Sequence, residues 1–469
     1  MLELLAAEDA LRDRRRLGGQ TIQADGTVDA GRPTRPGGRA MSSCATSTSA
    51  ADFRWAVGIE NTFIPQTRAG HRRLDEYELM DHYRLWRGDI DLAADLGISS
   101  IRYGIPWYKV NPRPGVFDWS WTDEVLEHLA VRRGLTPIVD LMHYGTPMWL
   151  ENGFVNASYP RRVAEYAARF AERYGSLVRW YTPLNEPAVT AAYCGRDGRW
   201  PPYLSGVDGY LKVLLALAEG MIRTAAALRA ARPDAMLVHV EDVGLELGDS
   251  PATAGLAAEA QVDRLLALDL ACGLVGPGHA RYEWLIENGA DAGRLDYLTE
   301  HAPDWDVLGV NFYPWSNRRI VRRRNGRAHS RRDTDPSALA DVLKLVHGRY
   351  GLPMMVTETS TTGCPLERAR WMRETLGAVH EVRSEGVPVL GYTWFPLFTM
   401  IEWKYRWSRK GLEDHLLHLG LYEVRPRDGG MNRRETALVE AYRGHIADAA
   451  GSVGECAVPA EVAAVELVA

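Results

Sequence analysis

Short apolar segments alternate with longer amphipathic segments through most of the chain. Eight of the short segments are apolar almost throughout, a pattern typical of parallel strands that are covered on both faces. We therefore expect eight strands. They occupy residues 53–58, 100–105, 136–142, 178–185, 235–241, 305–312, 352–358 and 387–395.

The segments between these strands predict helices. Residues 209–231 and 366–383 have helical periodicity, and a further helix follows Pro160. Its apolar face comprises Val163, Tyr166, Ala167, Phe170 and Tyr174. Strands separated by helices predict an α/β fold, a single (β/α)8 TIM barrel. A doubly wound open sheet has the same alternation. No G-x-G-x-x-G turn follows the first strand, however, which disfavours the dinucleotide-binding form of that fold.

The two ends of the chain lack this alternation. Residues 1–50 are rich in Gly, Arg, Pro, Ser and Thr without an apolar period, and we expect a disordered extension there. From Asp448 the chain is rich in Ala, Val and Glu, and we expect a loose tail over 448–469. The predicted barrel domain therefore spans residues 51–447.

Composition and charge disfavour nucleic acids and membranes as binding partners. The chain has 469 residues, of which 46% are hydrophobic, and a net charge of −6, so nothing favours a nucleic-acid partner. No segment approaches the roughly 20 apolar residues of a membrane helix. The first residues lack a secretory signal pattern, so we expect a cytoplasmic protein that binds no membrane. The oligomeric state is left open.

Two carboxylates stand where barrel chemistry is expected, at the carboxyl ends of strands. Glu186 directly follows the fourth predicted strand and Glu358 ends the seventh. Glycoside cleavage needs one acid to protonate the leaving oxygen and a second group across the sugar, roughly 5–5.5 Å away when configuration is retained. Glu186 and Glu358 are therefore candidates for this pair of acids. The alternative for Glu186, which follows Asn185, is a helix-capping carboxylate.

Five segments resemble motifs of glycoside hydrolase family 1, the β-glucosidase and β-galactosidase family. They occur in family order between about Phe53 and Arg443. TPLNEP at 182–187 is similar to T-x-N-E-P, and VTETS at 356–360 to I/V-T-E-N-G. LMHYGTP at 141–147 resembles L-x-H-W-D-x-P, GVNFY at 309–313 resembles G-x-N-Y-Y, and residues 391–403 resemble G-Y-x-x-W-S-L-x-D-N-F-E-W. The resemblance implies a TIM-barrel O-glycosyl hydrolase, β-glucosidase-like, in which Glu186 is the acid/base and Glu358 the nucleophile.

The resemblance also implies a set of sugar-positioning side chains at the strand ends. They are Arg102, His143, Asn185, Asn311, Tyr313, Trp394, Glu402 and Trp403. Arg102 stands where the family's R-F-S places an arginine beside the nucleophile. Phe395 is an alternative to Trp394, since Trp394 lies one position before the family's tryptophan.

We expect neither a metal nor a cofactor, because two-carboxylate cleavage requires none. His415 and His418 could suggest a metal site, but we interpret them as part of a loop helix.

The sequence differs from the family motifs at individual positions. The first strand continues as GIENTFIPQ without the segment A-x-Q-x-E-G, whose Gln grips sugar hydroxyls, so Glu60 or Asn61 would have to replace it. Thr359 follows the predicted nucleophile where the family has Asn, and Tyr144 stands in place of an indole. Glucose specificity therefore does not carry over. The basic segment 318–332 is either an anion site for the leaving group or a solvated hairpin, and we favour the hairpin.

We therefore expect a retaining, exo-acting β-glycosidase that hydrolyses a terminal β-linked sugar from a small-molecule glycoside. Two alternatives stay open. The first is a transglycosidase that tailors a small natural product. The second, motivated by the missing first-strand Gln, is a catalytically silent sugar-binding barrel.

Overall fold

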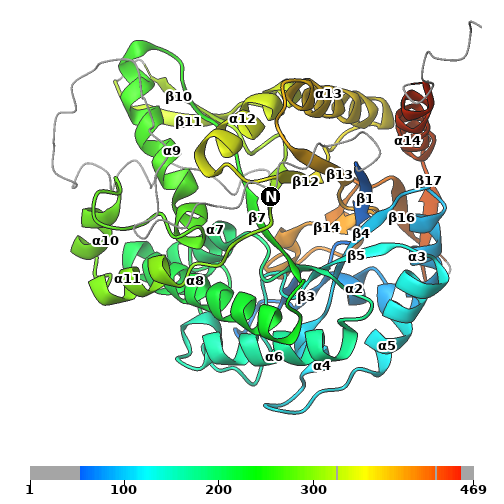
Figure 1. The fold of residues 1–469 in the computed structure, drawn as a ribbon, viewed down its shortest axis with the longest axis horizontal. Coiled ribbons are helices and arrows are strands. Elements are labelled where there is room, and N and C mark those ends of the chain that lie inside the picture. The colour runs from blue at the N-terminus through cyan, green and yellow to red at the C-terminus, as the bar shows by residue number, and fades with distance from the viewer. Residues whose placement is uncertain (1–52, 324–325, 428–429, 456–469) are drawn as a thin grey trace, which may run out of the picture.

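The computed structural model describes residues 53–323, 326–427 and 430–455. The predicted extension over residues 1–50 lies outside them. Eight parallel strands close into a barrel in the order β1-β13-β12-β9-β7-β6-β5-β4. All eight predicted strands and the TIM-barrel fold are confirmed (Figure 1). The barrel strands are β1 (Arg54–Gly58), β4 (Ser100–Gly104), β5 (Thr136–Asp140), β6 (Trp180–Thr182), β7 (Met236–Asp242), β9 (Val307–Phe312), β12 (Met354–Thr359) and β13 (Val389–Trp394).

Helices surround the strands (Figure 1). The predicted helix after Pro160 is α6, and its five apolar residues are buried as expected because they face α8 and the barrel. The larger helices are α3 (His82–Ala94), α6 (Tyr159–Tyr174), α8 (Gly206–Ala231), α9 (Pro251–Ala271), α11 (Ala292–Glu300), α12 (Leu339–Tyr350) and α13 (Pro365–Ser384). Shorter ones are α2 (Glu76–Leu79), α4 (Trp107–Val110), α5 (Ser120–Leu126), α7 (Pro187–Ala191) and α10 (Tyr282–Glu287).

Small sheets lie outside the barrel. The basic segment forms an antiparallel hairpin of β10 (Arg318–Arg322) and β11 (Ala328–Arg332), with β8 (Glu246–Gly248) beside β10. The segment is thus a hairpin, as predicted, and it lies beside α9 at the edge of the molecule (Figure 1), while its role toward anions stays a prediction. The remaining pairs are β2 (Phe63–Ile64) with β3 (Leu74–Asp75), β14 (Met400–Ile401) with β15 (Leu416–Leu417), and β16 (Tyr422–Arg427) with β17 (Gly430–Glu435).

The C-terminal helix corrects one predicted boundary. The sequence placed the end of the folded part at residue 447, but α14 (Ala437–Glu455) continues eight residues beyond it. Tyr442 anchors this helix, because its buried hydroxyl donates to the Ala56 carbonyl of β1 at 2.7 Å. Alanine has the highest helix propensity, so an Ala-rich segment extends a helix that packing has already started. Residues 456–469 of the predicted tail lie outside the described residues.

Within the described ranges, no helix is both long enough and apolar enough to cross a membrane.

Candidate active site

Glu186 occupies a strained turn between β6 and α7. Its φ is 47°, a left-handed conformation that residues other than glycine seldom adopt, and its N–H donates to the Val240 carbonyl of β7 at 3.1 Å. Pro187 then begins α7, where a missing N–H costs nothing. Although Glu186 is the N-cap residue, its side chain makes no capping hydrogen bond. The helix-capping alternative is therefore wrong, and the carboxylate is directed elsewhere.

The Glu186 carboxylate is buried, with 5% of the residue exposed. The Tyr144 hydroxyl donates to its Oε2, and Asn311 Nδ2 donates to its Oε1 at 2.7 Å. Burial raises the pKa of Glu186 well above its ordinary value, and the charge of Glu358 raises it further, while both donors oppose the shift. Glu186 therefore tends to hold a proton near neutral pH.

Glu358 lies where the ladder of β12 is irregular. The register of β12 against β9 shifts between Val356 and Glu358, and such bulges commonly re-aim side chains beside functional sites. Arg102 donates to Oε1 of Glu358, and the Tyr313 hydroxyl donates to Oε2 at 2.7 Å. Burial raises the pKa of Glu358, but the charge and hydrogen bond of Arg102 oppose this rise. The two acids therefore differ: Glu358 is in contact with the Arg102 guanidinium, whereas no Arg or Lys of the described residues pairs with Glu186.

Arg102 is the centre of a buried polar network. Its Nη2 lies 2.8 Å from Oδ2 of Asp140 and donates to Oδ1 of Asn185 at 2.6 Å. Asn311, held by the Thr357 hydroxyl at 2.7 Å, lies beside the same amide oxygen at 3.3 Å. The predicted residues Arg102, Asn185, Asn311 and Tyr313 thus meet around the two glutamates.

His143 joins this network from the end of β5. Asn185 Nδ2 lies 3.1 Å from Nε2 of His143, and the amide must donate there because its oxygen accepts from Arg102. The imidazole proton therefore lies on Nδ1, which faces Asp140 Oδ2 at 3.4 Å. On the other side, Oε1 of Glu60 lies 3.7 Å from Nε2. His143 is thus placed at the site, between Asp140 and Glu60.

Of the two candidates for the missing first-strand Gln, Glu60 borders the site. It contacts His143, and its charge acts on Glu358. Asn61 is packed instead against Gly104 of β4, where a Cβ would come within 1.8 Å of the Asn61 amide. Gly104 is thus needed for the close approach of these two segments, and the buried Oδ1 of Asn61 has no hydrogen-bond partner among the described residues.

Aromatic side chains form one wall of the site. Trp403 lies 5.3 Å from Tyr144, 5.5 Å from Tyr193 and 5.0 Å from Trp200 between ring centroids. Because Tyr144 donates to Glu186, this cluster adjoins the predicted acid/base. Sequence reasoning missed Tyr193, which lies in the π-helix η5 (Ala192–Arg196), and Trp200, which lies in the loop after it, because neither belongs to a motif. It noted Tyr144 only as a departure, although a position next to His143 was a usable signal.

The prediction that Trp394 lies at the site is wrong, and its neighbour Phe395 lies there instead. Trp394 is completely buried, and its indole N–H donates to the Leu419 carbonyl at 3.1 Å, so it packs outside the sugar site. Phe395 takes the inner position. Its ring lies 5.4 Å from the Arg102 guanidinium and is stacked 6.2 Å from His143. Gly58 makes room for it, since a Cβ there would lie 2.3 Å from the Phe395 ring.

Glu402 follows β14 and precedes Trp403. Its carboxylate lies 3.5 Å from Lys404 Nζ and 3.7 Å from His415 Nδ1. His415 ends a short 3-10 helix, whereas His418 lies beyond β15 and bonds the Thr399 hydroxyl at 2.8 Å. The two histidines therefore serve different neighbours. In the described part of the chain, no three His, Cys, Asp or Glu side chains form a group able to hold a metal ion.

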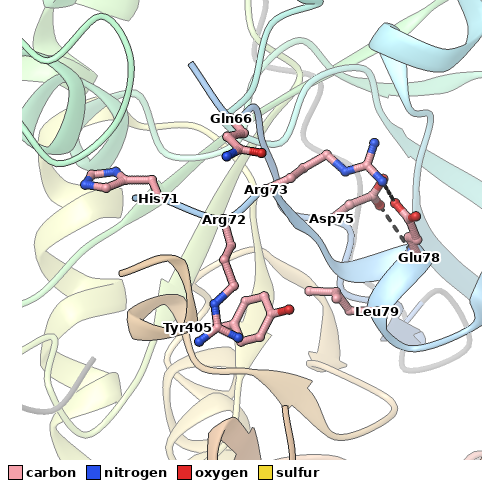
Figure 2. A pocket seen from close by; sticks show the side chains of 8 residues that line it. All are labelled: Gln66, His71, Arg72, Arg73, Asp75, Glu78, Leu79 and Tyr405. Carbon is pink, nitrogen blue, oxygen red and sulfur yellow. Dashed lines mark hydrogen bonds and ion pairs between the residues drawn. The ribbon is translucent and has the colours of Figure 1, made fainter. Parts of the chain in front are cut away.

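A cavity of about 290 Å³ is lined in part by Tyr405 but by none of the predicted sugar residues (Figure 2). It lies between the segment after β1 and the 3-10 helix η7 (Trp403–Arg406), and Arg73 pairs with Glu78 across it. Arg72 covers the Tyr405 ring, with its guanidinium carbon 4.0 Å from the ring centroid. Both bordering segments follow barrel strands at their carboxyl ends. The cavity is thus at the same end of the barrel as the two glutamates. It is lined by Gln66, His71, Arg72, Arg73, Asp75, Glu78, Leu79 and Tyr405.

This barrel, with two buried acids and a hydrogen-bonded polar network at one end, has the fold and the kind of site of an O-glycosyl hydrolase. Comparisons with known proteins agree. The model of glycosyl hydrolase family 1 matches residues 61–246. Beta-glucosidase 47 of Arabidopsis thaliana is 24% identical over 392 residues, covering 74% of this chain and 72% of that protein. The bifunctional beta-D-glucosidase/beta-D-fucosidase of Bifidobacterium breve is 26% identical over 399 residues, covering 70% and 82%.

A solved structure gives the same fold. The beta-glucosidase from Thermotoga maritima in complex with castanospermine superimposes with a TM-score of 0.74 at 19% identity, covering 85% of this chain and 98% of that one. The chain thus resembles glycosyl hydrolase family 1 in sequence, at 24% and 26% identity to these two relatives.

Proposed function

We propose that the protein is a retaining β-glycosidase that removes a terminal β-linked sugar from a small glycoside, with Glu358 as nucleophile and Glu186 as acid/base. The observation that carries the proposal is the unequal environment of the two buried acids. Glu358 accepts hydrogen bonds from Arg102 and Tyr313, whereas the pKa of Glu186 is raised well above its ordinary value by burial and by the charge of Glu358. One acid bare and one protonated is the state that double displacement needs at its start.

In the first step, a carboxylate oxygen of Glu358 attacks the anomeric carbon while the bond to the leaving oxygen breaks. The proton of Glu186 passes to that oxygen, and the sugar is left as an ester of Glu358. The negative charge of Glu358 is consumed in this step, and Glu186 becomes ionised. In the second step, Glu186 takes a proton from water, the water oxygen attacks the anomeric carbon, and Glu358 is released as a carboxylate.

The surrounding residues position both acids and the sugar. Arg102 and Tyr313 hold the two oxygens of Glu358, and Asn311 holds Glu186. His143, Asn185, Glu402 and Trp403 are proposed to contact the sugar, and Phe395 replaces Trp394 in this set. A rigid, hydrogen-bonded carboxylate is aligned for attack before the substrate arrives, which lowers the entropic cost of the step.

The test is Glu358→Gly assayed with an aryl β-glycoside. Removal of the nucleophile should lower kcat on the order of 10⁴–10⁶-fold, as for other covalent catalysts. Azide fits the space left by the carboxylate and should restore turnover, giving the glycosyl azide of inverted, α configuration. Glu385→Gly, at the exposed end of α13, is the control and should keep full activity without responding to azide. Full activity of Glu358→Gly would end the proposal.

A further inference from the structure

The inner part of the site carries more negative than positive charge. Glu60, Asp140 and Glu358 are buried carboxylates. Among the residues that the structure describes, Arg102 is the only Arg or Lys side chain that pairs with any of them. With Glu186 protonated, three carboxylates face one guanidinium. A buried surplus of like charge is costly unless a bound group of opposite charge offsets it.

Glu60 is the member of this group that makes no ion pair with Arg or Lys in the described chain. Its Oε1 accepts from the Thr62 N–H at 2.8 Å and from the Thr62 hydroxyl at 2.7 Å. No hydrogen bond from the described residues reaches its Oε2. The residue is 8% exposed, and its charge reaches Glu358, Tyr144 and Tyr313. Glu60 therefore presents an oxygen with spare accepting capacity to the centre of the site.

A second observation also points to a ligand with polar groups. Trp403 is 7% exposed, and its indole Nε1 is buried without a hydrogen-bond partner. Buried donors are normally satisfied, so an unpaired N–H beside a binding site indicates a group that arrives with the ligand. Trp403 is in ring contact with Tyr144, whose hydroxyl donates to Glu186. The site thus offers a free donor at the aromatic wall and a free acceptor at Glu60.

We propose that the sugar bound by this site is an amino sugar, whose ammonium group binds Glu60 while a hydroxyl oxygen accepts from the Trp403 indole. This rests on the proposed function, because it names the substrate class of the same site. An ammonium group donates to Oε2 of Glu60 and reduces the surplus negative charge. A neutral hydroxyl can donate to the same oxygen but leaves the charge surplus unchanged. A hydrogen bond between ionised groups is therefore the source of the preference.

The experiment compares regioisomeric aryl amino-deoxy-β-glycosides with the neutral parent glycosides. For at least one isomer, kcat/KM should exceed that of the neutral parent by about 10- to 100-fold, the range of a charged hydrogen bond. Glu60→Gln keeps the shape and removes the charge, so the ratio of amino to neutral kcat/KM should fall by about 10-fold or more. Glu78→Gln, on the rim of the cavity in Figure 2, is the matched control and should leave that ratio unchanged.

Non-hydrolysable thioglycosides separate this inference from the proposed function. Calorimetric Kd values for the amino and neutral thioglycosides, on the wild type and on Glu60→Gln, measure the preference without turnover. Tighter amino binding that Glu60→Gln abolishes would support the inference even in the absence of catalysis, which would count against the proposed function alone. Preference for the neutral sugar in every pair, or an equal loss for both sugars in Glu60→Gln with an unchanged melting temperature, would overturn it.

Discussion

The side-chain oxygen of Asn185 lies 2.6 Å from Nη2 of Arg102, and this contact sets the direction of the hydrogen bonds around both acids. Because the amide oxygen accepts from Arg102, the amide nitrogen must donate, and it reaches the Tyr144 oxygen at 3.0 Å. The Tyr144 proton is then directed to Glu186. The arginine that holds Glu358 is thus linked to Glu186 through two intervening side chains.

This link predicts the effect of Tyr144→Phe on pH dependence. The Tyr144 hydroxyl lowers the pKa of Glu186 by stabilising the carboxylate, so its removal raises that pKa further. The general acid is active when protonated, and activity is lost as pH rises through its pKa. The alkaline limb of kcat/KM should therefore move to higher pH by about 1–2 units, as expected for a lost hydrogen bond to a charged group.

The control for Tyr144→Phe is Tyr193→Phe, which removes a hydroxyl from the same aromatic cluster but not from Glu186. Its alkaline limb should coincide with that of the wild type. Rate profiles of both variants between pH 5 and 10 provide the comparison. An alkaline limb that moves to lower pH in Tyr144→Phe would contradict the direction of this hydrogen bond.

Substitutions of Trp394 and Phe395 should have opposite effects, one mainly on stability and the other mainly on kcat/KM. Trp394→Phe leaves the buried Leu419 carbonyl without its donor, which should lower the free energy of unfolding by about 1–3 kcal/mol with little change in kcat/KM. Phe395→Ala removes the ring against Arg102 and His143, so kcat/KM should fall at least about 10-fold. Urea denaturation and steady-state kinetics on both variants test this. A larger kinetic loss in Trp394→Phe than in Phe395→Ala would restore Trp394 to the site.

The same two residues show what the sequence can and cannot predict. The barrel was predictable because strands covered on both faces are apolar throughout, and Glu186 and Glu358 because each ends such a strand. The choice between Trp394 and Phe395 was not predictable, since successive strand side chains point to opposite faces and a shift of one position exchanges them. Trp200 was missed because a loop has no fixed period, and the end of α14 because a contact with β1 stabilises it.

We expect a substitution in the basic hairpin to leave KM unchanged for acidic and for neutral glycosides. Arg319 pairs with Asp333, and Arg322 donates to the Gly326 and Ala252 carbonyls, so these side chains are engaged in holding the hairpin. Arg322→Ser should therefore leave KM within about 2-fold for an acidic and for a neutral glycoside, as is usual for exposed sites. A rise in KM for the acidic glycoside alone would show that the hairpin binds anionic leaving groups.

Because His239 on β7 is buried, we expect the free energy of unfolding to fall in mild acid. It is 1% exposed, both ring nitrogens lack a partner, and burial lowers its pKa to about 3. In the unfolded chain its pKa is about 6.5, so below that pH the unfolded state binds a proton that the folded state refuses. The contribution of His239 to stability is therefore fully present above pH 6.5 and falls as pH decreases toward 3, by about 2 kcal/mol at pH 5.

His239→Leu should remove this contribution. Between pH 7 and pH 5, the free energy of unfolding of this variant should therefore fall by about 2 kcal/mol less than that of the wild type. Urea denaturation at the two pH values measures it, with His301→Gln, at the exposed end of α11, as the control. An equal pH dependence in His239→Leu and the wild type would mean that His239 can be protonated within the fold.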